Sequence, residues 1–153
     1  MTNQAEITAE CTNYYKDLYN FEPVDSEAQN YLLTKAAPLA ENLADLCEGM
    51  ITGAECTEAI KQMDNNKSPG SDGLPREFYH KLFHLFSEGF AEMLNNAYAS
   101  KSLSSTQKLG IITLICKDQT SPEFLNNWRP LSLLNCDYKI LSKVLANRLR
   151  KVL

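Results

Sequence analysis

The residues best suited to chemistry lie in the segment NWRPLSLLN, which covers residues 127–135. This segment holds the only tryptophan of the chain and places Arg129 directly before Pro130. A proline ring fixes its own φ angle, so it helps to hold the neighbouring arginine in one place. A guanidinium group presents a planar fork of donors that matches phosphate or carboxylate oxygens. The segment therefore predicts that Arg129 meets an anion.

A second candidate for anion binding is the loop DNNKSPGSDGLP, residues 64–75, which is dense in turn-forming residues. Lys67 supplies a positive charge in this loop. Backbone amides that could form a concave anion-binding nest belong to Ser68, Gly70, Ser71 and Gly73. The loop is not a Walker loop, because no Gly-Lys-Ser/Thr follows it. A plain connector between two helices is the alternative interpretation.

The third candidate is a basic helix predicted from Tyr138 to Lys151, with Asp137 as its cap. At about 100° per residue, the basic and apolar residues fall on opposite faces. The basic face carries Lys139, Lys143 and Arg150, and the apolar face carries Ile140, Leu141, Val144 and Leu145. A solvated basic face is the alternative to a binding surface. Arg148 projects from the apolar arc, which predicts a structural ion pair, a snorkelling side chain or a functional role.

The charge is divided unevenly along the 153 residues. Residues 1–60 carry two basic and eleven acidic side chains, a balance of −9, whereas residues 61–153 carry thirteen basic and eight acidic ones, a balance of +5. A local basic surface can bind a phosphate backbone even when the total charge is negative. If the protein binds nucleic acid, the second part of the chain is expected to bind it.

Composition excludes several classes of protein. Hydrophobic residues make up 44% of the chain, which is typical of a folded domain. No apolar run reaches the ~20 residues that span a bilayer, and the start lacks the pattern of a secretory signal. The five cysteines form no CxxC pair, and His80 and His84 have no cysteine near them, so a zinc site is not expected. Reduced thiols in an intracellular compartment fit this pattern.

The first third of the chain predicts short helices. The first ends before Glu22-Pro23, a second runs from a Ser26 cap through Leu33, and a third begins at Pro38 and ends near Gly49. Thr52 and Glu55 have the spacing of a capping box, which predicts a fourth helix from about Gly53 to Met63.

A long helix and two strands are expected next. Pro75 opens the helix, whose apolar stripe predicts a core face made of Phe78, Leu82, Phe86, Phe90, Met93, Leu94 and Ala97. Residues 110–115, GIITLI, predict a strand buried on both faces. Residues 130–134 alternate like a second strand, which would pair with the first across a polar loop. His80 and His84 are expected to be surface residues.

Three blocks of this sequence resemble the reverse transcriptases of LINE-type (non-LTR) retrotransposons, in the order and spacing of that family. The blocks are NNKSPGSDGLPREFY, KLGIITLICK and NWRPLSLLNCDYKILSKVLANRLRKVL. The resemblance implies an α+β, mostly helical fold with two parts. Residues 1–63 would be the helical linker that precedes the polymerase, and residues 64–153 would be the N-terminal fingers part of a right-hand polymerase, without its palm.

The resemblance also implies site residues and partners. Lys117 and Arg129 would reach the triphosphate of an incoming deoxynucleotide. An RNA template, or its duplex with a DNA primer, would be contacted through the sugar–phosphate backbone by Lys67, Ser68, Gly70, Gly73, Lys139 and Lys143. Family members often carry a doubly basic segment where this chain has Cys116 and Asp118 around Lys117. The protein would act inside the cell, in the nucleus or cytoplasm, as a ribonucleoprotein.

The residues that would hold magnesium are missing from this sequence. Nucleotidyl transfer with two Mg²⁺ ions needs aspartates, which the family supplies downstream of the final helix and in a later Tyr/Phe-x-Asp-Asp turn. No Asp-Asp pair occurs in the 153 residues. We therefore expect no catalytic residue, no metal ligand and no cofactor in this chain, which should not polymerise by itself. The parent protein would use Mg²⁺ together with its palm and thumb.

Two alternative hypotheses about function fit the same sequence. In one, the chain is a small adaptor whose acidic helical half, residues 1–60, binds another protein. In the other, it is an inert retroelement relic that still carries its motifs. A chain separated from its palm is also expected to expose apolar surface, which predicts poor solubility or self-association.

Overall fold

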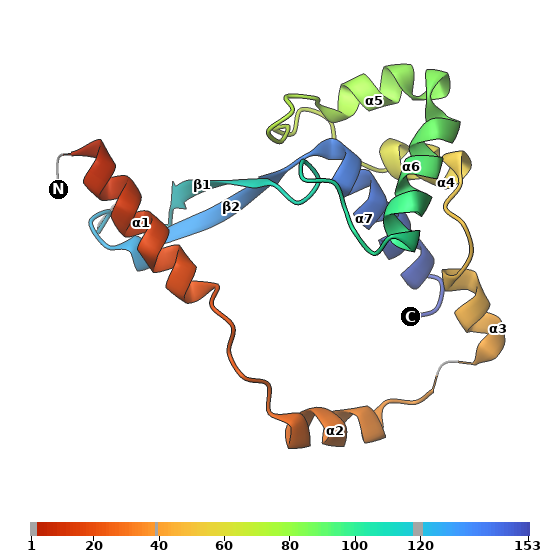
Figure 1. Cartoon of the computed structure of the whole chain (residues 1–153), viewed down its shortest axis with the longest axis horizontal. Helices are drawn as coiled ribbons and strands as arrows, with labels where there is room; N and C mark the ends of the chain where they lie inside the picture. Colours follow the sequence, from red (N-terminus) through yellow and green to blue (C-terminus); the bar gives the residue numbers. More distant parts are fainter. Residues whose placement is uncertain (1–2, 39, 118–120) are drawn as a thin grey trace. The chain divides into compact units, whose positions relative to one another are not determined.

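A computed structural model describes residues 3–38, 40–117 and 121–153 (Figure 1). It divides into two compact units. The hairpin unit comprises Met1–Pro38 with Leu114–Arg129, and the helical unit comprises Leu39–Thr113 with Pro130–Leu153. Helices and one two-stranded sheet make up the described residues, which confirms the α+β, mostly helical fold. The predicted boundary between a linker (residues 1–63) and a fingers part (residues 64–153) stays a prediction.

The core of the helical unit lies among α4 (Gly53–Lys61), α6 (Ser87–Ala99) and α7 (Cys136–Leu149). Its fully buried side chains include Cys56, Leu94, Ile140 and Val144. The predicted capping box is confirmed: the Glu55 amide donates to the Thr52 hydroxyl oxygen over 3.2 Å, and the Thr52 amide donates to the Glu55 carboxylate over 2.9 Å. Burial of the apolar face of α7 against α4 and α6 turns its basic face away from the core.

The long helix predicted from Pro75 is interrupted. The structure has α5 (Arg76–Leu82), a 3₁₀ turn (Phe83–Leu85) and then α6. In one continuous helix, Tyr79 and Phe90 would stand about 16 Å apart along the axis, whereas their ring centroids here are 6.0 Å apart. The break therefore folds the aromatic stripe onto itself. Of the predicted core stripe, Phe90 and Leu94 are buried, while Leu82 and Met93 are exposed.

The two predicted strands form β1 (Gly110–Cys116) and β2 (Trp128–Leu134), which pair with each other. The amide of Lys117 donates to the Asn127 carbonyl over 2.7 Å, which sets an antiparallel register. The expectation that β1 is buried on both faces is wrong. Ile111, Ile112 and Ile115 are each 45–51% exposed, because a two-stranded ribbon offers no second layer in this part of the structure.

The hairpin unit packs α1 (Gln4–Leu18) against the outer end of the ribbon. Tyr15, its one buried hydrophobic residue among those described, donates its hydroxyl to the Trp128 carbonyl over 3.4 Å. The Trp128 indole in turn donates to the Pro122 carbonyl over 2.9 Å and so fastens the loop between the strands. The tryptophan thus has a structural role. Helix α2 (Ser26–Lys35) buries no residue.

Three predicted helix starts are corrected by the structure. Asp25, not Ser26, caps α2, because its carboxylate accepts from two amides of the first turn. Helix α3 (Glu41–Ala44) begins after the position predicted from Pro38 and continues into a 3₁₀ turn (Asp45–Cys47). Asn135, not Asp137, holds the N-cap position of α7. Among the described residues, no helix combines the length and apolar character needed to cross a bilayer.

Candidate nucleic-acid interface

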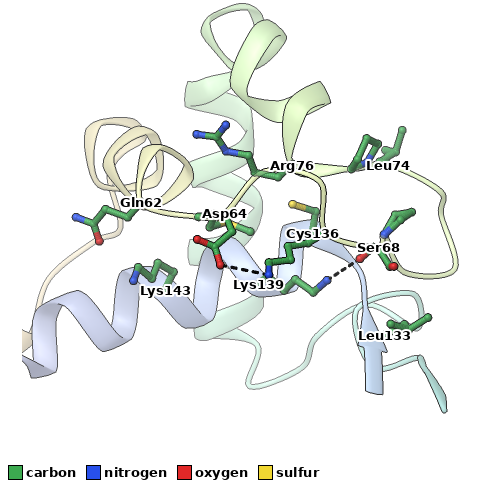
Figure 2. Close-up of a pocket in the computed structure, with 13 residues that line it drawn as sticks. Gln62, Asp64, Ser68, Leu74, Arg76, Leu133, Cys136, Lys139 and Lys143 are labelled. Atoms are coloured by element: carbon green, nitrogen blue, oxygen red, sulfur yellow. Dashed lines mark hydrogen bonds and ion pairs between the residues drawn. The ribbon is translucent and has the colours of Figure 1, made fainter. Parts of the chain in front are cut away.

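A cavity of about 670 Å³ lies in the helical unit, between the 64–75 loop and helix α7 (Figure 2). Four of the six residues predicted to contact a template line it: Lys67, Ser68, Lys139 and Lys143. Figure 2 shows the two lysines of α7 along one side of the helix, with Asp64 and Ser68 across the cavity. The structure thus brings together two motifs that lie about seventy residues apart in the chain.

The charge of this cavity is predominantly positive. Its lining carries four basic side chains and one acidic side chain, Asp64. The Lys67 ammonium lies 3.6 Å from the Asp64 carboxylate, and both side chains are largely exposed, so this pair contributes little to stability. The Lys139 ammonium donates to the Ser68 carbonyl over 3.2 Å. Neither contact buries the lysine charges, which remain accessible to an anion that enters the cavity.

Arg76 also lines the cavity, but its guanidinium is used within the protein. It donates to the Ile60 carbonyl over 2.9 Å and to the Lys61 carbonyl over 3.4 Å, and it also bonds the Asn65 side chain. These carbonyls belong to the last turn of α4, whose orphan acceptors need partners. The arginine is 9% exposed. It therefore caps α4, a role that sequence reasoning missed because capping arginines have no fixed spacing.

The 64–75 loop holds its shape through internal contacts. Asn66 adopts a left-handed φ of 56°, and its amide donates to the Glu77 carboxylate over 2.7 Å. That hydrogen bond lowers the pKa of Glu77. Gly73, with a φ of 72°, donates its amide to the Gly70 carbonyl over 3.2 Å. The Gly73 amide is therefore not available to an anion in this conformation, and template contact by either glycine stays a prediction.

Gly70 is required by a close approach of two backbones. A Cβ atom built on it would overlap the backbone nitrogen and side-chain oxygen of Asn135 and stand 2.6 Å from the Leu134 carbonyl carbon. Asn135 is 1% exposed and bonds the loop through its side-chain amide. Sequence reasoning did not select Asn135, although it ends the quoted NWRPLSLLN segment. An asparagine directly before a helix is the signal that could have found it.

Arg148 points into the protein and confirms the interpretation as a structural ion pair. Its guanidinium donates twice to the Glu55 carboxylate, over 2.7 and 2.9 Å. The remaining donors bond backbone carbonyls of residues 47–50. The hydrogen bond from Arg148 lowers the pKa of Glu55 to about 2, and Glu55 raises the pKa of Arg148. This pair joins α7 to the start of α4.

Lys117 and Arg129 lie together in the hairpin unit. Lys117 faces Asn127 and Arg129 faces Ile115 in the register of the ribbon, so the two cations occupy one face at diagonal positions. Such neighbours stand about 7–8 Å apart. Both are exposed, while Leu114 and Trp128 on the other face are partly buried. The Lys117 ammonium donates to the Asn126 carbonyl over 2.7 Å. The acidic neighbour considered above, Asp118, lies outside the described residues.

The histidines and two of the cysteines differ in their burial. His80 and His84 are exposed, as predicted. No group of three His, Cys, Asp or Glu side chains could hold a metal ion within residues 3–38, 40–117 and 121–153. Burial raises the pKa of the Cys56 and Cys136 thiols to about 11. Both thiols therefore stay protonated near neutral pH and are poor nucleophiles.

The mostly helical α+β fold thus presents one cavity whose lining is predominantly cationic. No family model matches the chain. It is similar to the uncharacterized 149 kDa protein of transposon TX1 from Xenopus laevis, with 31% identity over 141 residues. The match covers 92% of this chain and 11% of that protein. This similarity supports a transposon origin for the chain.

Proposed function

We propose that the chain is the linker and fingers portion of a LINE-type reverse transcriptase, and that its loop–helix cavity contacts the template strand. Three observations support this proposal. The motif series occurs in the order found in those enzymes, the chain is similar to a transposon protein, and four predicted template residues line one cavity. The last observation carries the most weight, because nothing in the sequence spacing alone requires those motifs to meet.

The chemistry of the cavity suits a sugar–phosphate backbone. Lys67, Lys139 and Lys143 offer ammonium groups, each a compact charge with three donors, and the Ser68 hydroxyl adds a neutral donor. Contacts of this type position a strand and read no base. That property fits a polymerase, which must copy templates of any sequence. The same surface would accept an RNA template or its duplex with a DNA primer.

The Lys117–Arg129 pair would bind the triphosphate of a deoxynucleotide in this proposal. A guanidinium and an ammonium on one face of the ribbon provide a planar fork and a point charge. Two cations that meet a triphosphate offset its charge and help to orient it, which is the main requirement of phosphoryl transfer. The proposal assigns the pair a binding role only.

Magnesium would act in the longer polymerase. Mg²⁺ ions held by aspartates would stabilise the attacking and leaving oxygens of nucleotidyl transfer. The proposal assigns no catalytic residue or metal ligand to this chain, because its sequence has no Asp-Asp pair of the kind those enzymes use. In the proposal, the palm and thumb of the longer protein complete the site, and the assembly works as an intracellular ribonucleoprotein.

The test is a titration of the chain with a fluorescently labelled RNA–DNA primer–template at 50, 100 and 200 mM salt. We expect weak binding whose log affinity falls with log salt by about 0.7–0.9 per neutralised phosphate. Lys139→Glu/Lys143→Glu should weaken binding at least about tenfold, because two contacts become repulsive. Lys81→Glu/Lys108→Glu makes the same change in net charge at two exposed positions outside the cavity. This control should retain most of the affinity.

Two results would reject the template surface. One is binding that does not depend on salt, and the other is no binding by a sample whose circular dichroism shows the native helices. An equal loss of affinity in the cavity variant and the control variant would show that the net charge of the protein, and not the cavity, determines binding. Binding of a protein partner by the acidic residues 1–60, together with no binding of the primer–template, would instead favour an adaptor.

A further inference from the structure

We infer that Asn135 is a positioning residue, which fixes the 64–75 loop over α7 and so sets the arrangement of the lysines that meet the template. The inference rests on the proposed function for its ligand, a phosphate backbone. Its structural part rests only on contacts within the helical unit. Asn135 itself does not line the cavity, so it would act through the loop and the helix.

Both ends of the Asn135 amide are used. Its oxygen accepts from the Ser71 hydroxyl over 3.2 Å and from the Asp72 amide over 3.3 Å. Its nitrogen donates to the Thr106 carbonyl over 3.1 Å. The side chain is fully buried, and a buried amide that loses a hydrogen-bond partner destabilises the folded state. Asn135, the N-cap residue of α7, therefore connects the 64–75 loop to the segment before β1 through its side chain.

Asn135 could have served α7 as a side-chain cap but does not. It holds the N-cap position, yet its side chain makes no capping hydrogen bond. N-cap asparagines normally accept from an amide of the first helical turn, which stabilises the helix. Here the helix gives up that contribution and the oxygen goes to the loop instead. This exchange is what distinguishes a residue that positions the loop from one that only starts the helix.

Gly70 makes the attachment tight. With no Cβ, it brings the loop backbone directly against Leu134 and Asn135. The contact at Gly70 and the two hydrogen bonds from Ser71 and Asp72 together fix the distance between the loop and the start of α7. The positions of Lys67 and Ser68 depend on this distance, because they precede Gly70 by only three and two residues. Lys139 lies one helical turn beyond Asn135, to whose carbonyl its amide donates over 3.2 Å.

The consequence is that one buried side chain, outside the cavity, contacts both elements that carry the cavity lysines: the 64–75 loop through its side chain and α7 as its N-cap residue. The Lys139 ammonium reaches the Ser68 carbonyl, which requires the loop to stay at this distance from α7. If the loop lifts from α7, Lys139 and Lys143 keep their places on the helix while Lys67 moves away. A strand would then neutralise fewer charges at once, although the net charge of the protein is unchanged.

The salt dependence of binding separates positioning from simple stability. A variant that merely unfolds more easily lowers the fraction of active protein and leaves the slope of log affinity against log salt unchanged. A variant that misplaces Lys67 loses one phosphate contact, so the slope should fall by about 0.7–0.9. The affinity at 50 mM salt should fall about threefold to tenfold at the same time.

The experiment compares two pairs of variants in the full chain with the same RNA–DNA primer–template. Asn135→Ala removes the amide, and Gly70→Ala inserts a methyl group at the close contact. Asn95→Ala is the matched control for the first. The Asn95 side-chain oxygen accepts from the Ile51 amide, and its nitrogen donates to the Ile51 carbonyl, so this change also removes a side-chain amide that bonds the backbone. Gly89→Ala is the control for the second, since a Cβ there meets nothing within 4 Å. Both test variants should show the reduced slope, and both controls should keep the slope of the unaltered chain.

Amide hydrogen exchange of Asp72 gives a second readout that needs no nucleic acid. Asn135→Ala should speed this exchange, and Asn95→Ala should not, because the Asp72 amide donates to the side chain of Asn135. An unchanged salt slope in folded Asn135→Ala and Gly70→Ala would overturn the inference. If Asn135→Ala does not fold, Gly70→Ala decides by both readouts. If the unaltered chain does not bind at all, the proposed function fails, and unchanged Asp72 exchange would then separately reject the positioning role.

Discussion

Arg148 carries a positive charge into the interior of the helical unit, where Glu55 and the carbonyls of residues 47–50 surround it. Its side chain is 8% exposed and that of Glu55 is 31% exposed. Removing one partner from such a pair leaves the other charge uncompensated, which is far more costly than losing an ion pair at the surface. The basic residues of α7 thus divide into one that builds the fold and others that face outward.

The stability of the chain should depend on pH through Glu55. Its folded-state pKa is depressed from 4.5 to about 2, chiefly by the hydrogen bond from Arg148. A depressed pKa contributes stability that is fully present above pH 4.5 and is lost as pH falls toward 2. Glu55→Gln should therefore lower the free energy of unfolding at pH 7 by about 2 kcal/mol, after solvent screening of a partly exposed carboxylate. Urea unfolding from pH 7 to pH 2.5 would measure this.

The control for that measurement is Glu58→Gln, one helical turn away on the exposed side of α4. It should change the unfolding free energy by less than about 0.5 kcal/mol. Between pH 4.5 and 2.5 the curves of the unaltered chain and Glu55→Gln should converge. Parallel curves across this range would contradict the assigned role of the pair.

At the scale of elements, the sequence predicts those segments whose signals are local. The capping box at Thr52 and the α4 helix follow from spacing within one or two helical turns, and the structure confirms both. Of the predicted basic face of the last helix, Lys139 and Lys143 line the cavity, whereas Arg150 lies at the C-cap of α7. The break between α5 and α6 does not follow in this way, because it depends on rings eleven residues apart that pack together. The exposure of β1 likewise depends on how many strands and helices surround it.

The candidate site shows the same division. The sequence supplies Lys67, Lys139 and Lys143 as cations, because charge and helical phase are readable along the chain. It does not supply Asn135 or Arg76, whose partners lie in other elements. Residues that touch a ligand can be selected by their chemistry. Residues that hold those side chains in place can be found only when the packed elements are known.

The ribbon formed by β1 and β2 carries a prediction of its own. In the proposed function, adding a deoxynucleoside triphosphate should shift the backbone NMR signals of Lys117, Asn127 and Arg129, while the deoxynucleoside without phosphates should not. Arg129→Ala should weaken the interaction about tenfold, since it removes a charge-assisted hydrogen-bonding group. Lys16→Ala, an exposed change on α1 of the same unit, is the matched control. Equal shifts with the deoxynucleoside would argue against triphosphate recognition.

At the scale of the whole molecule, the two units differ sharply in how much apolar surface they bury. Tyr15 is the one buried hydrophobic residue of the hairpin unit among those described, and the others belong to the helical unit. Large apolar side chains are more than half exposed in and around α2, at Leu18, Tyr19, Phe21, Val24, Tyr31, Leu32 and Leu33. Exposure of this kind supports the expectation of self-association or of a further protein surface that covers it.

Amide hydrogen exchange should reveal this difference along the chain. Amides of α4 and α7 are expected to exchange at least about a hundredfold more slowly than those of α2, because local opening of a helix without buried side chains costs little free energy. The measurement should be made over a range of protein concentrations. Protection of α2 equal to that of α7 at the lowest concentration would contradict the prediction, whereas protection that appears only on concentration would report self-association.

The Arg148–Glu55 pair also bears on how the protein is made. The two residues are 93 positions apart, and α7 supplies Ile140 and Val144 to the core that α4 requires. During translation, α4 leaves the ribosome long before α7 does, and chains fold as complete units when their parts have emerged. We therefore expect the apolar faces of α4 and α6 to lack their partner on the growing chain until α7 has been released.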